Sequence, residues 1–325
     1  MKKINGLSLF FILVLIGIII GPLIIPLPPL MDIQPIEELV YPDSQFKNVE
    51  GINIHFQARE NGSSKLFILL HGFGSSTYSW NKVLDPISSF GSIIAFDRPA
   101  FGLTERVIPN VDVDFNPYML DFQPSIVMDF VHDIKPEKTI LVGNSAGGTV
   151  ALKTALDYPG EIDALILVSP AVYGGGGAPK WIRPLLNIPH FNRLGPVFVR
   201  SIRERGLELL KLAWFDPNQI SDADLENYQK PLSIENWDKA LWEFTKANGE
   251  NDIQDRIADV SIPVLVISGE NDQIIPKEQS IQLASELPNS DLVIIPNCGH
   301  VPQEECPDLF MKAIDDFIRN LDSQK

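Results

Sequence analysis

One stretch constrains the architecture of this chain more than any other: Thr139-Ile140-Leu141-Val142-Gly143-Asn144-Ser145-Ala146-Gly147. Its mostly apolar start predicts a buried β-strand, and residues 148–158 after it have a helical pattern. A G-x-S-x-G sequence between a strand and a helix is typical of a tight turn that carries a nucleophile at its tip. We therefore expect Ser145 to have strained backbone geometry and a hydroxyl that projects from the edge of a sheet.

A serine hydroxyl needs a base and an orienting acid before it becomes a strong nucleophile. Two candidates follow later strands, because Asp272 comes after the apolar run 263–268 and His300 after the run 292–295. The carboxyl ends of parallel strands meet at one edge of an α/β sheet, so both side chains are expected near Ser145. The sequence therefore predicts a catalytic triad of Ser145, His300 and Asp272.

Five ordered motifs make the chain similar to a known family. They are His71-Gly72-Phe73-Gly74, Phe96-Asp97-Arg98-Pro99-Ala100-Phe101-Gly102, the Ser145 turn, Gly269-Glu270-Asn271-Asp272 and Cys298-Gly299-His300. From about residue 45 onward the chain resembles the α/β-hydrolase superfamily, in the branch with a helical lid after the sixth core strand. The resemblance implies a mostly parallel, twisted eight-stranded α/β sheet. It also implies an oxyanion hole made by the backbone N–H groups of Phe73 and Ala146.

The acid and the base both have competitors. Glu270 lies two residues before Asp272, but the family pattern places the acid at the later position. Asp97 is expected to support the turn at Gly102 rather than to take part in chemistry. The other histidines are expected on an early strand, on the oxyanion loop, on a helix and in the lid; they are His55, His71, His132 and His190. His300 remains the expected base.

We expect four parts along the chain. These are a membrane anchor at 1–30, a first part of the hydrolase core at 31–171, a helical lid at 172–251 and the rest of the core at 252–325. The lid segment is too long for an ordinary connection, and its amphipathic patterns are broken by prolines. Its clearest helices are expected at 200–215, 221–229 and 234–248, with 173–177 as a flexible stem. Aromatic side chains in the lid either pack onto the core or face a pocket, where they would favour an acyl or aryl group.

The N-terminal segment is unusually apolar. Lys2 and Lys3 precede an uncharged stretch from 4 to 30, which is long enough to cross a bilayer as a helix. An uncleaved single-pass anchor is the prediction, and a cleaved signal peptide and a buried core helix are the alternatives. No alanine precedes Ala58, so an A-x-A cleavage site is missing. Because basic residues favour the cytoplasmic side, the catalytic domain is expected outside.

The composition of the chain restricts the classes of partner and cofactor that it is expected to bind. The formal net charge is −16 and Lys/Arg runs are absent, which argues against a nucleic-acid partner. The sequence has no metal-ligand cluster and no dinucleotide fingerprint, so no cofactor and no metal are expected. The two cysteines, Cys298 and Cys306, flank His300. We expect two reduced, partly buried thiols, with a small loop-closing disulfide as the alternative.

These patterns together predict a membrane-anchored serine hydrolase that cleaves a carboxylic ester of a lipophilic small molecule. Within the family, serine at the turn argues against dehalogenase and epoxide hydrolase chemistry, which needs aspartate there. The same triad serves hydrolysis of a C–C bond or acyl transfer, and both stay open as alternatives. A non-catalytic binding protein that retains the fold is the alternative of another class.

Overall fold

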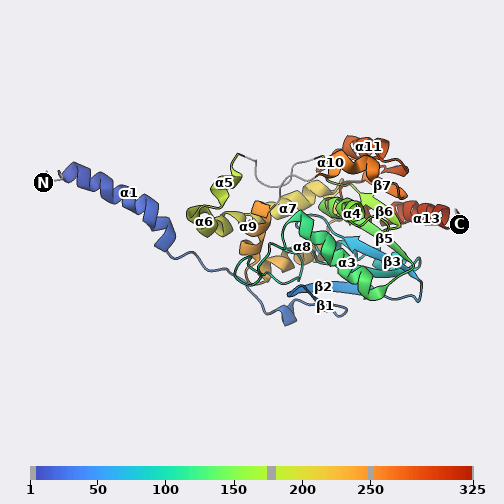
Figure 1. Ribbon diagram of the computed structural model, residues 1–325, viewed down its shortest axis with the longest axis horizontal. Helices are drawn as coiled ribbons and strands as arrows, with labels where there is room; N and C mark the ends of the chain where they lie inside the picture. The colour runs from blue at the N-terminus through green and yellow to red at the C-terminus, as the bar shows by residue number, and fades with distance from the viewer. Residues whose placement is uncertain (1–4, 174–180, 248–251, 324–325) are drawn as a thin grey trace.

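The computed structural model describes residues 5–173, 181–247 and 252–323. Its centre is an eight-stranded sheet with the strand order β1-β2-β4-β3-β5-β6-β7-β8 (Figure 1). The strands are β1 (Gln45–Val49), β2 (Ile52–Arg59), β3 (Lys65–Leu70), β4 (Ser92–Phe96), β5 (Lys138–Asn144), β6 (Ala164–Val168), β7 (Val264–Gly269) and β8 (Ser290–Ile295). β1 and β2 pair antiparallel with their neighbours, and all later strands pair parallel. The expected mostly parallel α/β-hydrolase sheet is confirmed.

Two hydrophobic cores lie on opposite faces of this sheet. On β3, the side chains of Leu66, Ile68 and Leu70 belong to one core, and those of Phe67 and Leu69 belong to the other. Strand side chains alternate with a period of two, so a strand that is buried on both faces has to be apolar throughout. The first core is covered by α3 (Gln123–Ile134), α4 (Ala146–Asp157), α10 (Ile253–Arg256) and α11 (Lys277–Glu286), and the second by α2 (Leu84–Ser88) and α13 (Pro307–Ser323).

Among the described residues, six α-helices lie between β6 and β7, and we call the first five the lid. They are α5 (Arg183–Leu186), α6 (Pro189–Val199), α7 (Ile202–Ala213), α8 (Asp222–Gln229) and α9 (Trp237–Ala247). The last three agree with the expected helices, whereas α5 and α6 were not predicted. Prolines look like helix breakers, but Pro184 and Pro189 lie in the first turns, where proline is tolerated because the N–H there has no partner within the helix. A third proline, Pro196, lies in the interior of α6.

The lid packs on the loops that follow the core strands. Phe244 of α9 contacts Phe101 with ring centroids 4.9 Å apart, and Phe101 contacts Phe73 at 5.5 Å. Trp237 and Leu241 are buried in the same cluster. The domain boundaries at 171 and 251 stay predictions. Of the predicted stem, 174–177 lies outside the described residues.

The N-terminal helix α1 (Gly6–Ile24) extends away from the core and none of its described residues is buried (Figure 1). It is long and apolar enough to cross a membrane, although a signal sequence has the same properties. An apolar helix without a buried residue does not suit the alternative of a core helix, which has to bury its side chains.

The prediction of two reduced thiols is wrong in this structure, which joins Cys298 and Cys306 in a disulfide. The two residues flank the short helix α12 (Pro302–Glu305), and their Cα atoms lie 6.3 Å apart, within the range that a disulfide spans. The sequence separation of eight residues does not reveal this, because only the turn through α12 brings the second cysteine back to the first.

Candidate active site

Ser145 lies at a turn between β5 and α4 with backbone angles φ 53° and ψ −119°. A non-glycine residue rarely adopts a positive φ, and such strain is typical of nucleophile elbows. The neighbouring glycines explain how the turn closes. A Cβ on Gly143 would lie 2.5 Å from the carbonyl oxygen of Gly147, and one on Gly147 would lie 2.0 Å from that of Leu70. The expected strained geometry of Ser145 is therefore present.

The expected base and acid are hydrogen-bonded to each other. Nδ1 of His300 lies 2.8 Å from Oδ2 of Asp272, and both side chains are buried. The other carboxylate oxygen accepts the backbone N–H groups of Ile274 and Ile275 at 2.9 and 2.8 Å. These two donors fix the carboxylate through Oδ1. Its Oδ2 then orients the imidazole so that Nε2 is available for a proton.

Ser145 and His300 line the same pocket. No hydrogen bond between the Ser145 hydroxyl and the imidazole occurs in the described part of the chain. Hydrogen bonds between nucleophile and base are often long before a substrate binds, so the shared pocket is the relevant observation.

Of the two expected oxyanion donors, one lines this pocket and the other directly follows Ser145. Phe73 lines it, and Ala146 is the first residue of α4, where helix geometry leaves the N–H without an intrahelical acceptor. Gly72 brings the two segments together, because a Cβ there would lie 3.3 Å from the Cβ of Ser145. An anion beside Ser145 would also be stabilised by the N-terminus of α4.

Asn144 was not singled out from the sequence, where it is the variable residue of the G-x-S-x-G pattern. Its side-chain amide donates to the carbonyl oxygens of Val168 at 3.2 Å and His300 at 3.1 Å. The turn that carries Ser145 is thus tied to the backbone of His300. A polar residue at this buried position is the signal that sequence reasoning could have used.

Glu305 is a second residue that the sequence did not reveal. Its buried carboxylate accepts the backbone N–H groups of Gly299 at 2.6 Å, Phe215 at 3.1 Å and Asp216 at 2.8 Å. In addition, the N–H of His300 donates to the carbonyl oxygen of Ala213 at 2.6 Å. His300 is therefore held by the end of lid helix α7 as well as by the core.

The competing acid Glu270 is exposed, and its carboxylate lies 3.8 Å from the ammonium of Lys277. His71 is fully buried below the oxyanion loop, and its Nε2 accepts the N–H of Arg98 at 3.0 Å. Burial and the nearby Arg98 charge lower the pKa of His71 to about 3, so its ring stays neutral. His71 therefore lies at the oxyanion loop as expected, whereas Glu270 is exposed.

A second Ser–His–Asp chain occurs at the start of the sheet. Oγ of Ser44 lies 2.7 Å from Nε2 of His55, whose Nδ1 lies 2.6 Å from Oδ2 of Asp97. The Ser44 hydroxyl also accepts the N–H of Tyr41 at 2.8 Å, and Asp97 accepts the N–H groups of Thr77 and Leu103. Although burial favours the neutral acid, His55 and the N–H of Leu103 lower the pKa of Asp97 to about 2. The chain joins β2 to neighbouring loops and has a structural role.

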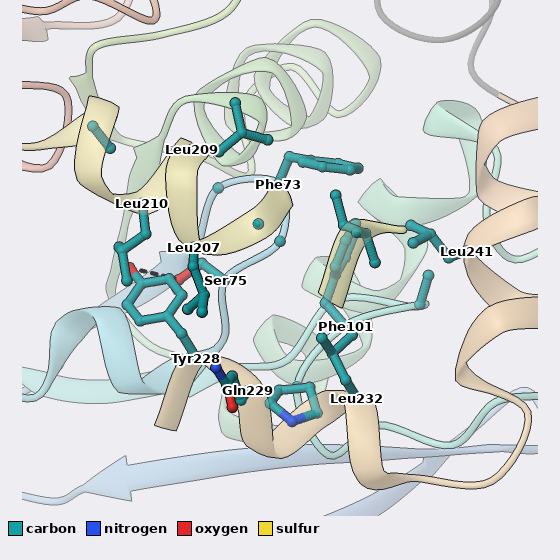
Figure 2. Close-up of a pocket in the computed structure, with 18 of the residues that line it drawn as sticks. Phe73, Ser75, Phe101, Leu207, Leu209, Leu210, Tyr228, Gln229, Leu232 and Leu241 are labelled. Atoms are coloured by element: carbon teal, nitrogen blue, oxygen red, sulfur yellow. Dashed lines mark hydrogen bonds between the residues drawn. The ribbon is translucent and has the colours of Figure 1, made fainter. Parts of the chain in front are cut away.

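The pocket beside Ser145 is a cavity of about 250 Å³ between core and lid. Figure 2 shows its apolar walls, with Phe73 and Phe101 from the core facing leucines of α7 and Leu241 of α9. A polar edge is formed by Ser75 and Tyr228, whose hydroxyl groups lie 3.5 Å apart. A mostly apolar cavity with a few polar groups is typical of a site for a small organic substrate.

One group of potential metal ligands lies close together in the described residues, namely Cys298, Cys306 and Glu305. Both sulfur atoms belong to the disulfide, and the Glu305 carboxylate already accepts three N–H groups. A thiolate is the form of cysteine that binds metals, so these residues do not fit a metal site.

Comparison with known proteins agrees with this geometry. Residues 65–307 match the family model for the alpha/beta hydrolase fold, and the chain belongs to this family. It is 29% identical over 285 residues to the uncharacterized hydrolase YugF of Bacillus subtilis (strain 168), which covers 87% of this chain and 100% of that protein. It is 27% identical to a 2-hydroxy-6-oxononadienedioate/2-hydroxy-6-oxononatrienedioate hydrolase of Escherichia coli O139:H28 (strain E24377A / ETEC), over 85% of this chain and 95% of that protein. Among solved structures, a putative lipase (lip1) from Acinetobacter baumannii AYE has a TM-score of 0.68 and 22% identity, over 87% of this chain and 92% of its own.

Proposed function

We propose that the protein is a serine hydrolase that cleaves carboxylic esters with a lipophilic acyl or alcohol group. The observation that carries this proposal is the hydrogen-bonded pair of His300 and Asp272, which shares an apolar pocket with the strained Ser145. Membership of a family of hydrolases supports an enzymatic role over a binding protein with a retained fold.

The proposed reaction has two halves. The Ser145 hydroxyl attacks the ester carbonyl carbon while Nε2 of His300 takes its proton, and the N–H groups of Phe73 and Ala146 stabilise the oxyanion. His300 then protonates the departing alkoxide, which leaves as an alcohol, and an acyl-enzyme remains. Water repeats the sequence, releasing the carboxylic acid and restoring Ser145.

Hydrolysis of a C–C bond is the second candidate reaction. The relative from E. coli suggests a specific substrate for it, because its name describes hydrolysis of a 2-hydroxy-6-oxo dienedioate. Two carboxylates in such a substrate would need cationic partners in the pocket. The pocket arginines are already engaged, since Arg106 donates to the carbonyls of Phe101 and Gly102, and Arg203 pairs with Asp32 at 2.9 Å. The pocket therefore favours an apolar ester over a dicarboxylate.

We also propose that α1 is an uncleaved anchor and that the catalytic domain lies outside the cytoplasm. The length and hydropathy of the helix support the anchor. The Cys298–Cys306 disulfide supports the orientation, because disulfides persist in oxidising compartments. Protease accessibility in intact cells tests this part, and protection of the C-terminal domain would contradict it.

Labelling with a fluorophosphonate probe tests the nucleophile. We expect the wild-type protein to be labelled and Ser145→Ala to lose all labelling. Ser44→Ala is the matched control, since Ser44 belongs to the other Ser–His–Asp chain and should leave labelling unchanged. Loss of labelling in the Ser44 variant together with retention in the Ser145 variant would overturn the assignment.

Turnover on two substrate classes separates the candidate reactions. We expect hydrolysis of p-nitrophenyl esters to increase from acetate to medium acyl chains, because the pocket walls are apolar. Cleavage of a 2-hydroxy-6-oxo dienedioate should be at least 100-fold slower in kcat/KM. The reverse order of the two rates would make the C–C bond reaction the correct one.

A further inference from the structure

The first part of the lid has a charge pattern unlike the rest of the chain. No acidic residue occurs between Asp163 and Glu204, and this interval contains five Lys/Arg residues from 180 to 203. The whole chain has a formal net charge of −16. A basic and apolar segment within an acidic protein is typical of a surface that meets anionic groups.

The same part of the lid is attached to the end of α1. Nε2 of His190 lies 2.5 Å from the carbonyl oxygen of Ile19, in the last turns of α1. Arg193 donates to the carbonyl oxygen of Ile25 at 2.9 Å. Lid helix α6 therefore lies beside the end of α1 that faces the core, as Figure 1 shows.

The attachment continues along the segment after α1. Arg200 donates to the carbonyl oxygen of Pro28 at 2.7 Å, and Arg203 pairs with Asp32 at 2.9 Å. Further along, the N–H of Gln34 donates to the carbonyl oxygen of Ser233 at 2.9 Å. Residues 25–34 thus run along the lid and fix its position relative to α1.

The lid exposes large apolar side chains next to this attachment. Trp181, Leu185, Ile188 and Phe198 are 76%, 44%, 41% and 62% exposed, and they lie on or beside α5 and α6. In Figure 1, α5 and α6 form the end of the molecule nearest α1. We call these four side chains together with Arg193 the lid face.

We propose that the lid face rests on the bilayer that α1 spans and that it favours anionic lipid. This inference rests on the proposed anchoring role of α1. Apolar side chains bordered by arginine are the pattern that binds the interface of a membrane, where arginine meets lipid phosphates. Arg193 of α6 contacts no carboxylate in the described residues, whereas Arg200 and Arg203, which follow α6, are paired with Asp238 and Asp32.

The lid face continues into the pocket wall through α7. Leu209 lines the pocket and is 45% exposed, so the pocket reaches the surface beside this helix. Since α7 directly follows α6 along the chain, a lipophilic substrate that leaves the bilayer at the lid face would enter the pocket beside α7. From this position of the lid we infer that the membrane itself is the source of the substrate.

Site-specific fluorescence tests the contact without requiring catalysis. The full chain carrying Phe198→Cys is labelled with an NBD fluorophore and inserted into vesicles of phosphatidylcholine, with or without phosphatidylglycerol. We expect blue-shifted emission and at least twofold quenching by nitroxide-labelled lipid when phosphatidylglycerol is present, and less without it. Asn320→Cys is the control, because Asn320 is exposed on α13, a helix at the end of the molecule opposite α1.

Two outcomes of this experiment would overturn the inference. Equal emission and quenching at positions 198 and 320 would show that the lid face does not meet lipid. Equal quenching at position 198 in both types of vesicle would remove the role given to Arg193 and the preference for anionic lipid.

Activity provides an independent measurement. We expect Phe198→Asp to lower hydrolysis of a vesicle-borne ester about tenfold while hydrolysis of soluble p-nitrophenyl acetate is unchanged. Leu309→Asp, an exposed leucine on α13, should change neither rate. If the wild type hydrolyses no ester, the proposed function fails while the fluorescence result still stands. If Phe198→Asp leaves the vesicle rate unchanged, the inference fails alone.

Discussion

This molecule contains two Ser–His–Asp arrangements. Their surroundings distinguish them better than the distances between their side chains do. The chain through Ser44 has both hydrogen bonds formed, but its hydroxyl and carboxylate are occupied by backbone N–H groups. Ser145 lacks the bond to its histidine in the described residues, yet it borders an apolar pocket at a helix N-terminus. A reactive site needs room for a substrate and donors for its developing charge, and only the second arrangement combines the two.

The acid of the proposed triad can be tested by an isosteric pair of substitutions. Asp272→Asn should lower kcat about 10⁴-fold, because the amide no longer holds the correct imidazole tautomer. Glu270→Gln should leave kcat unchanged, since Glu270 is exposed and pairs weakly with Lys277. Steady-state kinetics on a p-nitrophenyl ester measures both, and a larger loss in the Glu270 variant would contradict the assignment.

The contact between lid helices α6 and α9 shows how one glycine sets the approach of two elements. A Cβ on Gly195 would lie 2.0 Å from the indole of Trp242, which is buried. The helices can therefore pack only if the residue at 195 has no side chain. Gly206 on α7 differs, because the nearest atom to a Cβ there is 3.9 Å away, in Ile202.

These two glycines make a matched prediction. Gly195→Ala should lower the free energy of unfolding by about 1–3 kcal/mol, because the overpacked helix has to move away from Trp242. Gly206→Ala should raise it by about 0.5–1 kcal/mol, since alanine restricts the unfolded chain and favours the helix. Chemical denaturation measures both, and equal effects would contradict the packing argument.

Across the whole molecule, one buried carboxylate joins the core to the lid. Oε1 of Glu304 accepts the hydroxyl groups of Ser79 from the core and Tyr228 from the lid, each at 2.6 Å. Burial raises the pKa of Glu304 to about 7, and these two donors only partly offset it. The protein therefore holds an acid whose ionisation opposes folding near neutral pH.

The sign of the resulting pH dependence follows from linkage. Glu304 binds its proton more tightly in the native state than in the unfolded state. Its contribution to the free energy of unfolding is therefore fully present below the ordinary pKa of a glutamate and is lost as the pH rises to about 7. Glu304→Gln keeps an oxygen that accepts both hydroxyl groups but cannot ionise. The Glu304→Gln variant should therefore lose this decline in stability with pH and have a higher melting temperature at pH 8 than the wild type.

Melting curves from pH 5 to 8 provide the measurement. Glu278→Gln is the control, because Glu278 is exposed on α11 and should leave the pH profile unchanged. A Glu304→Gln variant whose stability falls with pH as steeply as that of the wild type would show that another group causes the decline.

The sequence alone determined the sheet and the Ser145 turn, because apolar runs and a G-x-S-x-G pattern between a strand and a helix are local signals. The pairing of Asp272 with His300 was also predictable, since parallel strands end at a common edge. Only the tertiary structure revealed the roles of Asn144 and Glu305, whose partners lie far away along the chain. The disulfide and the contact between α1 and the lid likewise depend on how distant segments meet, and no local pattern encodes that.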